Sequence, residues 1–331
     1  MQIKISQQEK VAFCGDIHFD TTTPSSRLDN YMDTCCQKID AIGDICQQEN
    51  VRYLFFAGDI FNRIQCTHEC VNRAGEVLLA LKQKNNIRLF AICGNHDLPR
   101  DSLARLKQSP IETLFRFGVL EHVDSSIPVD IVDATDATKI TRVCAYDFTQ
   151  KILPADKMKT ATILLAHMFF NQSGVTAIEG QNITKDEMAS YGYDMAFLGH
   201  DHEEHPSVMC KNTLVVRSGS LMRGTSHDYN FTREPGFVIV DNIFAPQKVR
   251  KVVLPYRPFK EILSQAVLSR KAQNAIDDSH KEALQGLAAK LAEAGDTDGS
   301  DKDTVLEMIQ TDTGITDNVR NLLLSYIARV S

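Results

Sequence analysis

The chain has 331 residues, of which 43% are hydrophobic and 24% are charged, and its formal net charge is −7. This balance is typical of a globular protein and excludes a disordered or fibrous chain, while the negative charge argues against a simple basic nucleic-acid coat. Apolar runs such as residues 51–57 are much shorter than the roughly 20 residues that cross a bilayer, so we expect no membrane segment.

The predicted elements alternate between apolar strand patterns and amphipathic helix patterns in the first part of the chain, and strands dominate afterwards. In chain order we predict strand 11–14, helix 29–48, strand 53–57, helix 70–84, strand 88–92, helix 102–117 and then strands 141–146, 162–166, 195–198, 214–217, 236–240 and 249–254. This order predicts an α/β fold, with a mixed sheet or two packed sheets and helices outside.

After residue 258 the strand patterns stop, and residues 259–331 have helical patterns. We therefore predict two parts, a domain of residues 1–258 and a helical C-terminal segment of residues 259–331. The C-terminal segment is acidic, since residues 261–331 hold 12 Asp and Glu against 7 Lys and Arg. An acidic segment is a poor contact for nucleic-acid phosphates.

Residues 1–9 lack the apolar stretch of a signal peptide. The chain also has nine cysteines, which remain thiols in a reducing compartment. We therefore expect a cytoplasmic protein.

Five short polar motifs lie just past the ends of predicted strands. They are Gly15-Asp16-Ile17-His18, Gly58-Asp59, Gly94-Asn95-His96-Asp97, His167 and Gly199-His200-Asp201-His202. Open α/β sheets place their sites beyond the carboxyl ends of the strands, so we expect these side chains to meet in one cleft. Carboxylate, amide and imidazole groups without a thiolate suit Mn²⁺, Fe or Zn²⁺ better than they suit a structural Cys-rich zinc site.

The order of these motifs resembles the calcineurin-like metallophosphoesterase family over residues 14–202. The resemblance implies a four-layer αββα sandwich of two mixed sheets and a pair of divalent cations, with Mn²⁺ as the first expectation and Fe or Zn as alternatives. Such cations lie about 3.5–4 Å apart and are bridged by a carboxylate and a water, which supplies the attacking hydroxide. Carried over by position, the first cation is bound by Asp16, His18 and His202, the second by Asn95, His167 and His200, and Asp59 bridges both.

The same resemblance implies that His96 and Asp97 are catalytic residues. His96 would face the phosphate, where it stabilises the transition state or protonates the leaving oxygen. Asp97 would orient His96, by the usual pairing of a carboxylate with an imidazole.

The residues that flank the motifs resemble the Mre11/SbcD branch of DNA-repair nucleases, in the compact form found in phages and some bacteria. The matching runs are Gly94-Asn95-His96-Asp97-Leu98-Pro99-Arg100, residues 218–224 and residues 235–241. The resemblance implies a DNA exonuclease or endonuclease of repair or recombination, with an SbcC/Rad50-like ATPase and a second copy of the chain as possible partners. The chain departs from that branch at Asn62, where many members have His or Asp, and in residues 259–331, which would be a reduced cap or a partner-docking segment.

Two other functions remain open. One is a small-molecule phosphodiesterase or phosphatase that acts on nucleotides, and the other is a metal-loaded scaffold without catalysis. Residues outside the motifs are expected to have structural roles: His122 has no ligand spacing, and Cys93 ends an apolar strand, where a thiol packs as a small hydrophobic group.

Overall fold

The computed structural model describes residues 1–172, 182–271, 273, 309–311, 320–321 and 324. Its contacts divide the chain into two units, Met1–Leu263 and Ser264–Ser331. In the second unit, the described residues other than Ser264 are helical, and the rest of the predicted helical segment lies outside the described residues. Within the described part of the chain, no helix is long and apolar enough to cross a membrane. The cytoplasmic location stays a prediction.

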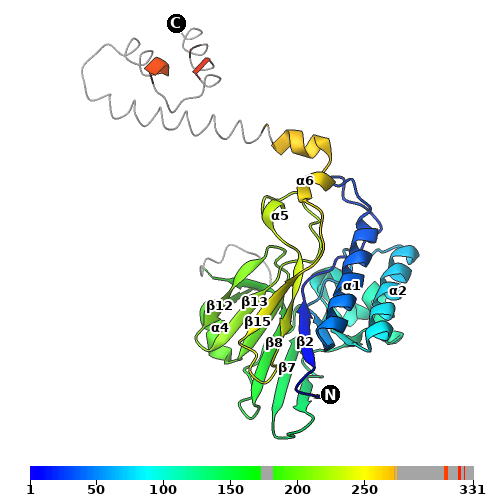
Figure 1. Ribbon diagram of the computed structural model, residues 1–331, viewed down its shortest axis with the longest axis vertical. Helices are drawn as coiled ribbons and strands as arrows, with labels where there is room; N and C mark the ends of the chain where they lie inside the picture. The colour runs from blue at the N-terminus through cyan, green and yellow to red at the C-terminus, as the bar shows by residue number, and fades with distance from the viewer. Residues whose placement is uncertain (173–181, 272, 274–308, 312–319, 322–323, 325–331) are drawn as a thin grey trace, which may run out of the picture. The chain divides into compact units, whose positions relative to one another are not determined.

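The first unit is built on two mixed sheets (Figure 1). Sheet A has seven strands in the order β1 (Gln2–Ile5), β6 (Val129–Asp133), β7 (Ile140–Tyr146), β8 (Ala161–His167), β11 (Met195–Gly199), β13 (Thr213–Arg217) and β12 (His205–Cys210). Sheet B has six strands in the order β15 (Val249–Val253), β14 (Gly236–Val240), β2 (Lys10–Cys14), β3 (Val51–Phe56), β4 (Arg88–Ala91) and β5 (Glu121–His122). A parallel pair, β9 (Phe169–Asn171) and β10 (Asn182–Thr184), forms a separate two-stranded sheet that packs on sheet A.

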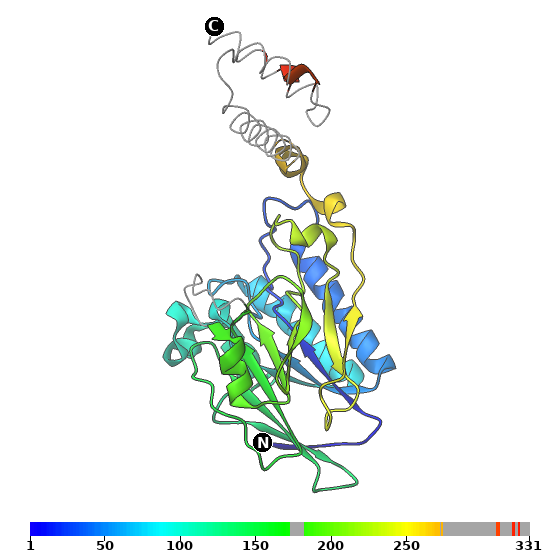
Figure 2. The ribbon, with the colours of Figure 1, turned by 90° about the vertical axis from the view of Figure 1, so that its left-hand side faces the viewer.

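The helices lie outside the two sheets. They are α1 (Tyr31–Gln48), α2 (His68–Asn85), α3 (Pro110–Arg116), α4 (Lys185–Tyr191), α5 (Tyr229–Thr232) and α6 (Phe259–Ile262), with 3₁₀ turns η1 (Asn95–Asp97), η2 (Pro99–Asp101) and η3 (Leu103–Gln108). Side chains begin the two long helices: Asn30 accepts from the backbone N–H of Asp33, and Thr67 accepts from that of Cys70. Each cap satisfies a backbone donor that has no partner inside its helix. Figure 2 looks onto sheet A, with α1 and α2 on the far side.

Three apolar clusters separate the layers. The strand β2 shows how, because its side chains alternate between two of them: Val11 and Phe13 face sheet A, while Ala12 and Cys14 face α1 and α2. On the other side of sheet A, the third cluster includes Met188 of α4. The layers are therefore helices, sheet B, sheet A and a thin helical layer, and the predicted αββα sandwich is confirmed.

Each predicted strand is present within a few residues of its expected bounds, and these include the edge strand β15. The edge strands β1, β5 and β12, the inner strand β6 and the pair β9 and β10 were not predicted. The edge strand β12 contains Pro206 and is mostly exposed, so it lacks a buried apolar pattern. The predicted helix 102–117 is divided into η3 and α3. The break falls at Pro110, which has no N–H to continue a helix and instead begins α3.

Phe13 tests the contact between the two sheets. Its ring is fully buried and lies 5.3 Å from that of Phe55 and 5.4 Å from that of Phe197, centroid to centroid. We expect Phe13→Ala to lower the free energy of unfolding by about 3–5 kcal/mol, because it leaves a cavity between the sheets. Phe117, which is 81% exposed, provides the control. Phe117→Ala should change stability in urea by less than about 0.5 kcal/mol, and equal losses in both variants would contradict this packing.

Candidate metal centre

The loops that carry the five motifs meet at one edge of the sandwich. β2, β3 and β4 are parallel neighbours in sheet B, and β8 and β11 are parallel neighbours in sheet A. The carboxyl ends of parallel strands lie at the same edge, so each sheet delivers its polar loops to one place. The motif side chains of both sheets are thus brought to one place, as expected.

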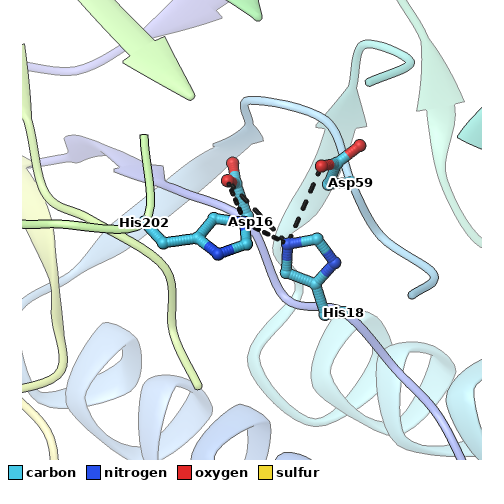
Figure 3. Close-up of side chains that lie close together, drawn as sticks. All are labelled: Asp16, His18, Asp59 and His202. Carbon is cyan, nitrogen blue, oxygen red and sulfur yellow. Dashed lines mark hydrogen bonds and ion pairs between the residues drawn. The ribbon is translucent and has the colours of Figure 1, made fainter. Parts of the chain in front are cut away.

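One group of side chains brings together Asp16, His18, Asp59 and His202, whose candidate ligand atoms lie within 4.8 Å of one another (Figure 3). Nε2 of His18 lies 3.7 Å from Oδ2 of Asp59 and 2.8 Å from Nε2 of His202. Asp16, His18 and Asp59 are buried, whereas the side chain of His202 is 34% exposed. The group is therefore enclosed by protein on most sides and reaches solvent at His202.

A second group shares Asp59 with the first and adds His167 and His200. Nε2 of His167 lies 3.3 Å from Oδ2 of Asp59, 3.0 Å from Oδ1 of Asn95 and 3.2 Å from Nδ1 of His200. All of the ligands expected from the sequence thus lie together, with Asp59 between the two groups. Their assignment as ligands stays a prediction.

The chemistry of these groups fits divalent cations. Oδ2 of Asp59 is buried and has no hydrogen-bond partner among the described residues, which is rare for a carboxylate oxygen unless an ion or water completes it. Nδ1 of His167 donates to the carbonyl oxygen of Ala57 at 2.7 Å, so its Nε2 is the ring nitrogen turned toward Asp59. Acceptor atoms therefore converge where a cation would supply the missing positive charge.

Two of the histidines have the protonation state that binds metals, and a third holds a proton that a cation would displace. Burial lowers the pKa of His18 to about 3 and that of His200 to about 3, so both imidazoles are neutral at pH 7. Burial alone would lower the pKa of His167 and raise that of Asp59, but their mutual attraction, together with Asp16, raises the pKa of His167 to about 9 and holds that of Asp59 well below its usual range. A bound cation would take the place of the proton on His167. Neutral imidazoles and an ionised carboxylate are the forms that bind metals.

A close contact between two loops fixes the position of Asp59. Asp59 has a φ of 49°, and a Cβ added to Gly94 would overlap both its carboxylate and its backbone nitrogen. Because only glycine leaves room there, the loop after β4 can pack directly on the shared carboxylate.

We therefore expect Gly94→Ala to displace Asp59 and to lower the content of divalent metal in the purified protein, measured by elemental analysis. Gly75 of α2 provides the control, because a Cβ there would meet only Leu114 Cδ2, at 3.5 Å. Gly75→Ala should keep its metal and gain about 0.5–1 kcal/mol of stability, since alanine favours a helix. Full metal content in Gly94→Ala would contradict the role of this contact.

His96 lies beside His18 of the first group. Its Nδ1 donates to the carbonyl oxygen of Asn62 at 2.6 Å, and its ring meets the ring of His18 edge-on at 4.9 Å between centroids. Its backbone N–H donates to Oδ1 of Asp59 at 2.9 Å. The Nε2 atom of His96 is therefore the ring nitrogen available to a substrate.

Asp97 does not orient His96 as the sequence led us to expect. Its buried carboxylate accepts from the backbone N–H groups of Ile60 at 3.2 Å, Phe61 at 3.1 Å and Gly94 at 3.1 Å. The orienting group is instead the carbonyl oxygen of Asn62, the position at which the chain departs from the Mre11/SbcD pattern. Asp97 joins the loops after β3 and β4 and thereby positions Asp59 and Asn95.

Two aromatic rings at the second group were not predicted. The ring of Phe169 lies 4.1 Å from that of His200, and Phe148 lies 5.7 Å from His200 and 6.0 Å from His167, centroid to centroid. Phe148 lies just after the end of β7, in the same way that the polar motifs lie just after their strands. This position in the sequence could have identified Phe148 as a residue of the site.

A third cluster of possible ligands, Cys93, His122 and Asp147, supports the loop after β4. Asp147 accepts from the backbone N–H of Cys93 at 2.6 Å and from Nε2 of His122 at 3.0 Å. His122 is thus engaged by a buried carboxylate, which fits the structural role expected for it. The same carboxylate fixes the strand end that leads to Gly94 and Asn95.

Comparison with known proteins agrees with this geometry. Residues 9–204 match the calcineurin-like phosphoesterase family. The DNA double-strand break repair protein Mre11 of Sulfolobus acidocaldarius is 23% identical over 223 residues, which cover 65% of this chain and 55% of that protein. The chain thus spans about half the length of this relative.

Solved structures align at lower similarity. The protein TT1561 of Thermus thermophilus aligns with a TM-score of 0.44 and 9% identity, covering 74% of this chain and 98% of that one. The sulfate thiohydrolase SoxB of Thermus thermophilus aligns with a TM-score of 0.43 and 12% identity, covering 82% and 61%. Because the family match extends over more than half of the sequence, the chain belongs to the calcineurin-like phosphoesterase family.

Proposed function

We propose that the chain is a two-metal phosphodiesterase that cleaves DNA in repair or recombination, with Mn²⁺ as its metal. The observation that carries this proposal is the combination of a shared Asp59 between two ligand groups with similarity to an Mre11 protein over 223 residues. Asp16, His18 and His202 would hold one cation, and Asn95, His167 and His200 the other. When bound, such a pair neutralises charge on a phosphoryl group and makes hydroxide available near neutral pH.

In this proposal, His96 is the residue that donates a proton to the substrate. Because its Nδ1 donates to the carbonyl oxygen of Asn62, a protonated His96 can give up a proton only from Nε2. That proton goes to the leaving oxygen as the P–O bond breaks, and the Asn62 carbonyl stabilises the imidazolium before the transfer. Asn62 therefore serves through its backbone, and its side chain binds Asp20 at 2.8 Å instead.

Basic residues close to His96 in the sequence support a polymeric phosphate substrate. Arg100 and Lys107 are exposed on the 3₁₀ turns η2 and η3, which follow directly after η1. Exposed arginine and lysine side chains bind DNA phosphates and make affinity fall with salt. A small nucleotide would not extend along such a surface.

The test is a comparison of substrates with manganese-loaded protein. We expect cleavage of labelled linear, hairpin or single-stranded DNA together with hydrolysis of bis-p-nitrophenyl phosphate. Phosphate release from nucleotides or hydrolysis of bis-p-nitrophenyl phosphate without DNA cleavage would establish the small-molecule enzyme instead. Full metal content without any hydrolysis would establish the scaffold.

We further propose that residues 259–331 contribute to assembly, either with an SbcC/Rad50-like ATPase or with a second copy of the chain. Two observations support this proposal. The chain is similar to an Mre11 protein, and this segment lies outside the family match at residues 9–204. Phe259 and Ile262 are buried within the first unit, so a truncation should follow Leu263 rather than residue 258. Truncated protein that keeps hydrolysis but loses co-purification with the ATPase would support docking, and unchanged co-purification would contradict it.

A further inference from the structure

A cavity of about 260 Å³ opens beside α1 and α6, within the first unit. Four of its lining residues are basic, Arg27, Lys38, Arg223 and Arg257, and its only acidic one is Asp29. Asp29 is already paired with Arg27 at 2.6 Å. The remaining basic groups of this cationic cavity therefore have no acidic counterpart in its wall.

Lys38 is buried and has few hydrogen-bond acceptors around its ammonium group. It is 5% exposed, and among the described residues its ammonium has a single hydrogen-bond partner, the carbonyl oxygen of Pro255 at 3.5 Å. In the described part of the chain no carboxylate lies within 4.0 Å of its Nζ. A buried ammonium has three donors and is costly to leave without acceptors.

Arg223 adds a second buried cation without a carboxylate partner among the described residues. It is 4% exposed and donates to the carbonyl oxygens of Asn230 and Arg257. Its guanidinium lies over the rings of Tyr256 at 5.1 Å and Phe259 at 4.9 Å. These contacts fix the position of the group, and they leave its charge uncompensated.

The titration of Lys38 reports the same excess of positive charge. Burial, together with the nearby positive charges of Arg223 and Arg233, lowers its pKa to about 7. An anion in the cavity would reverse this effect, because a nearby negative charge favours the protonated lysine.

We propose that the cationic cavity is a binding site for a phosphate group, held between Lys38 and Arg223. Phosphate matches the site because it offers several acceptor oxygens to an ammonium and a guanidinium together. The group can be free phosphate or the phosphate of a mononucleotide, whose base would then meet the exposed ring of Tyr256 at the rim. The site does not depend on the proposed nuclease function, since none of its lining residues is a predicted metal ligand.

Calorimetry with inorganic phosphate and manganese-loaded full-length protein tests the proposal. We expect two phosphate sites per chain, one at the metals and one in the cavity. Lys38→Met should weaken the cavity site by about tenfold or more, the effect of losing a charged hydrogen-bond donor. The hydrolysis of bis-p-nitrophenyl phosphate, and its inhibition by phosphate, should be unchanged in this variant, because the metal centre is intact.

Lys84→Met is the matched control, since Lys84 is an exposed lysine of α2 and its loss should leave both sites unchanged. A second variant, Arg257→Ala at the exposed rim, should weaken the cavity site without altering the buried packing. Deoxyadenosine monophosphate that binds the cavity more tightly than phosphate would identify a mononucleotide as the ligand, and equal binding would identify free phosphate. Unchanged phosphate binding in Lys38→Met, or a single site that is lost in Asp59→Asn, would overturn the proposal.

Discussion

Asp59→Asn is expected to lose both divalent cations and to lower hydrolysis of bis-p-nitrophenyl phosphate by about a thousandfold. The carboxylate lies in both ligand groups, and its buried Oδ2 is within 3.7 Å of Nε2 of His18 and 3.3 Å of Nε2 of His167. An amide has no negative charge to offer two cations. Metal-ion catalysis supplies several kcal/mol, and each 1.36 kcal/mol is a factor of ten in rate.

The measurement is metal content per chain, by elemental analysis and by manganese titration, next to the rate of hydrolysis. Asp194→Asn is the matched control, because Asp194 bonds to Thr162 at the opposite end of β8 and β11 from the metal centre. It should keep its metal and its activity. At most one divalent ion per wild-type chain at saturating manganese would contradict the two-metal site.

His96→Ser is expected to keep its metals and DNA binding while cleavage falls by about a hundredfold or more. The imidazole of His96 does not belong to either group of candidate ligand residues, and its Nδ1 is occupied by the Asn62 carbonyl oxygen. Its removal should therefore lower kcat and leave metal affinity unchanged. The rate constant and the calorimetric metal affinity separate these two effects.

His68→Ser serves as the control for this variant, because His68 is exposed at the start of α2. It should behave as the wild type in both measurements. Loss of metal from His96→Ser would show that His96 holds a cation, and unchanged cleavage would remove it from the proton transfer.

The location of the metal centre could be predicted from the sequence because strand ends are local features. Each predicted strand that carries a motif ends within two residues of a glycine or a histidine, and parallel neighbours bring their carboxyl ends to one edge. Asp16, Asp59 and Asn95 therefore meet without any knowledge of the loops. The family could be predicted from the order of the motifs, because that order depends only on residue types and their positions in the sequence.

The contacts made by the loops were decided by the tertiary structure. The sequence places Asp97 next to His96, but the fold turns its carboxylate to the backbone of the loop after β3 and gives His96 the carbonyl oxygen of Asn62. Backbone carbonyls are present at every residue, so no sequence pattern marks the one that orients a side chain.

The cationic cavity is the clearest case of a feature that only the tertiary structure decides. No sequence pattern marks Arg27, Lys38 and Arg223 as members of one cavity, and a solvated surface position is the ordinary expectation for each. The fold buries them together, because the loop before α1, the helix itself and the segment after β13 meet residues 255–262. Local sequence determined the elements and the ligand types of this protein, whereas the burial of charge depends on which distant segments pack together.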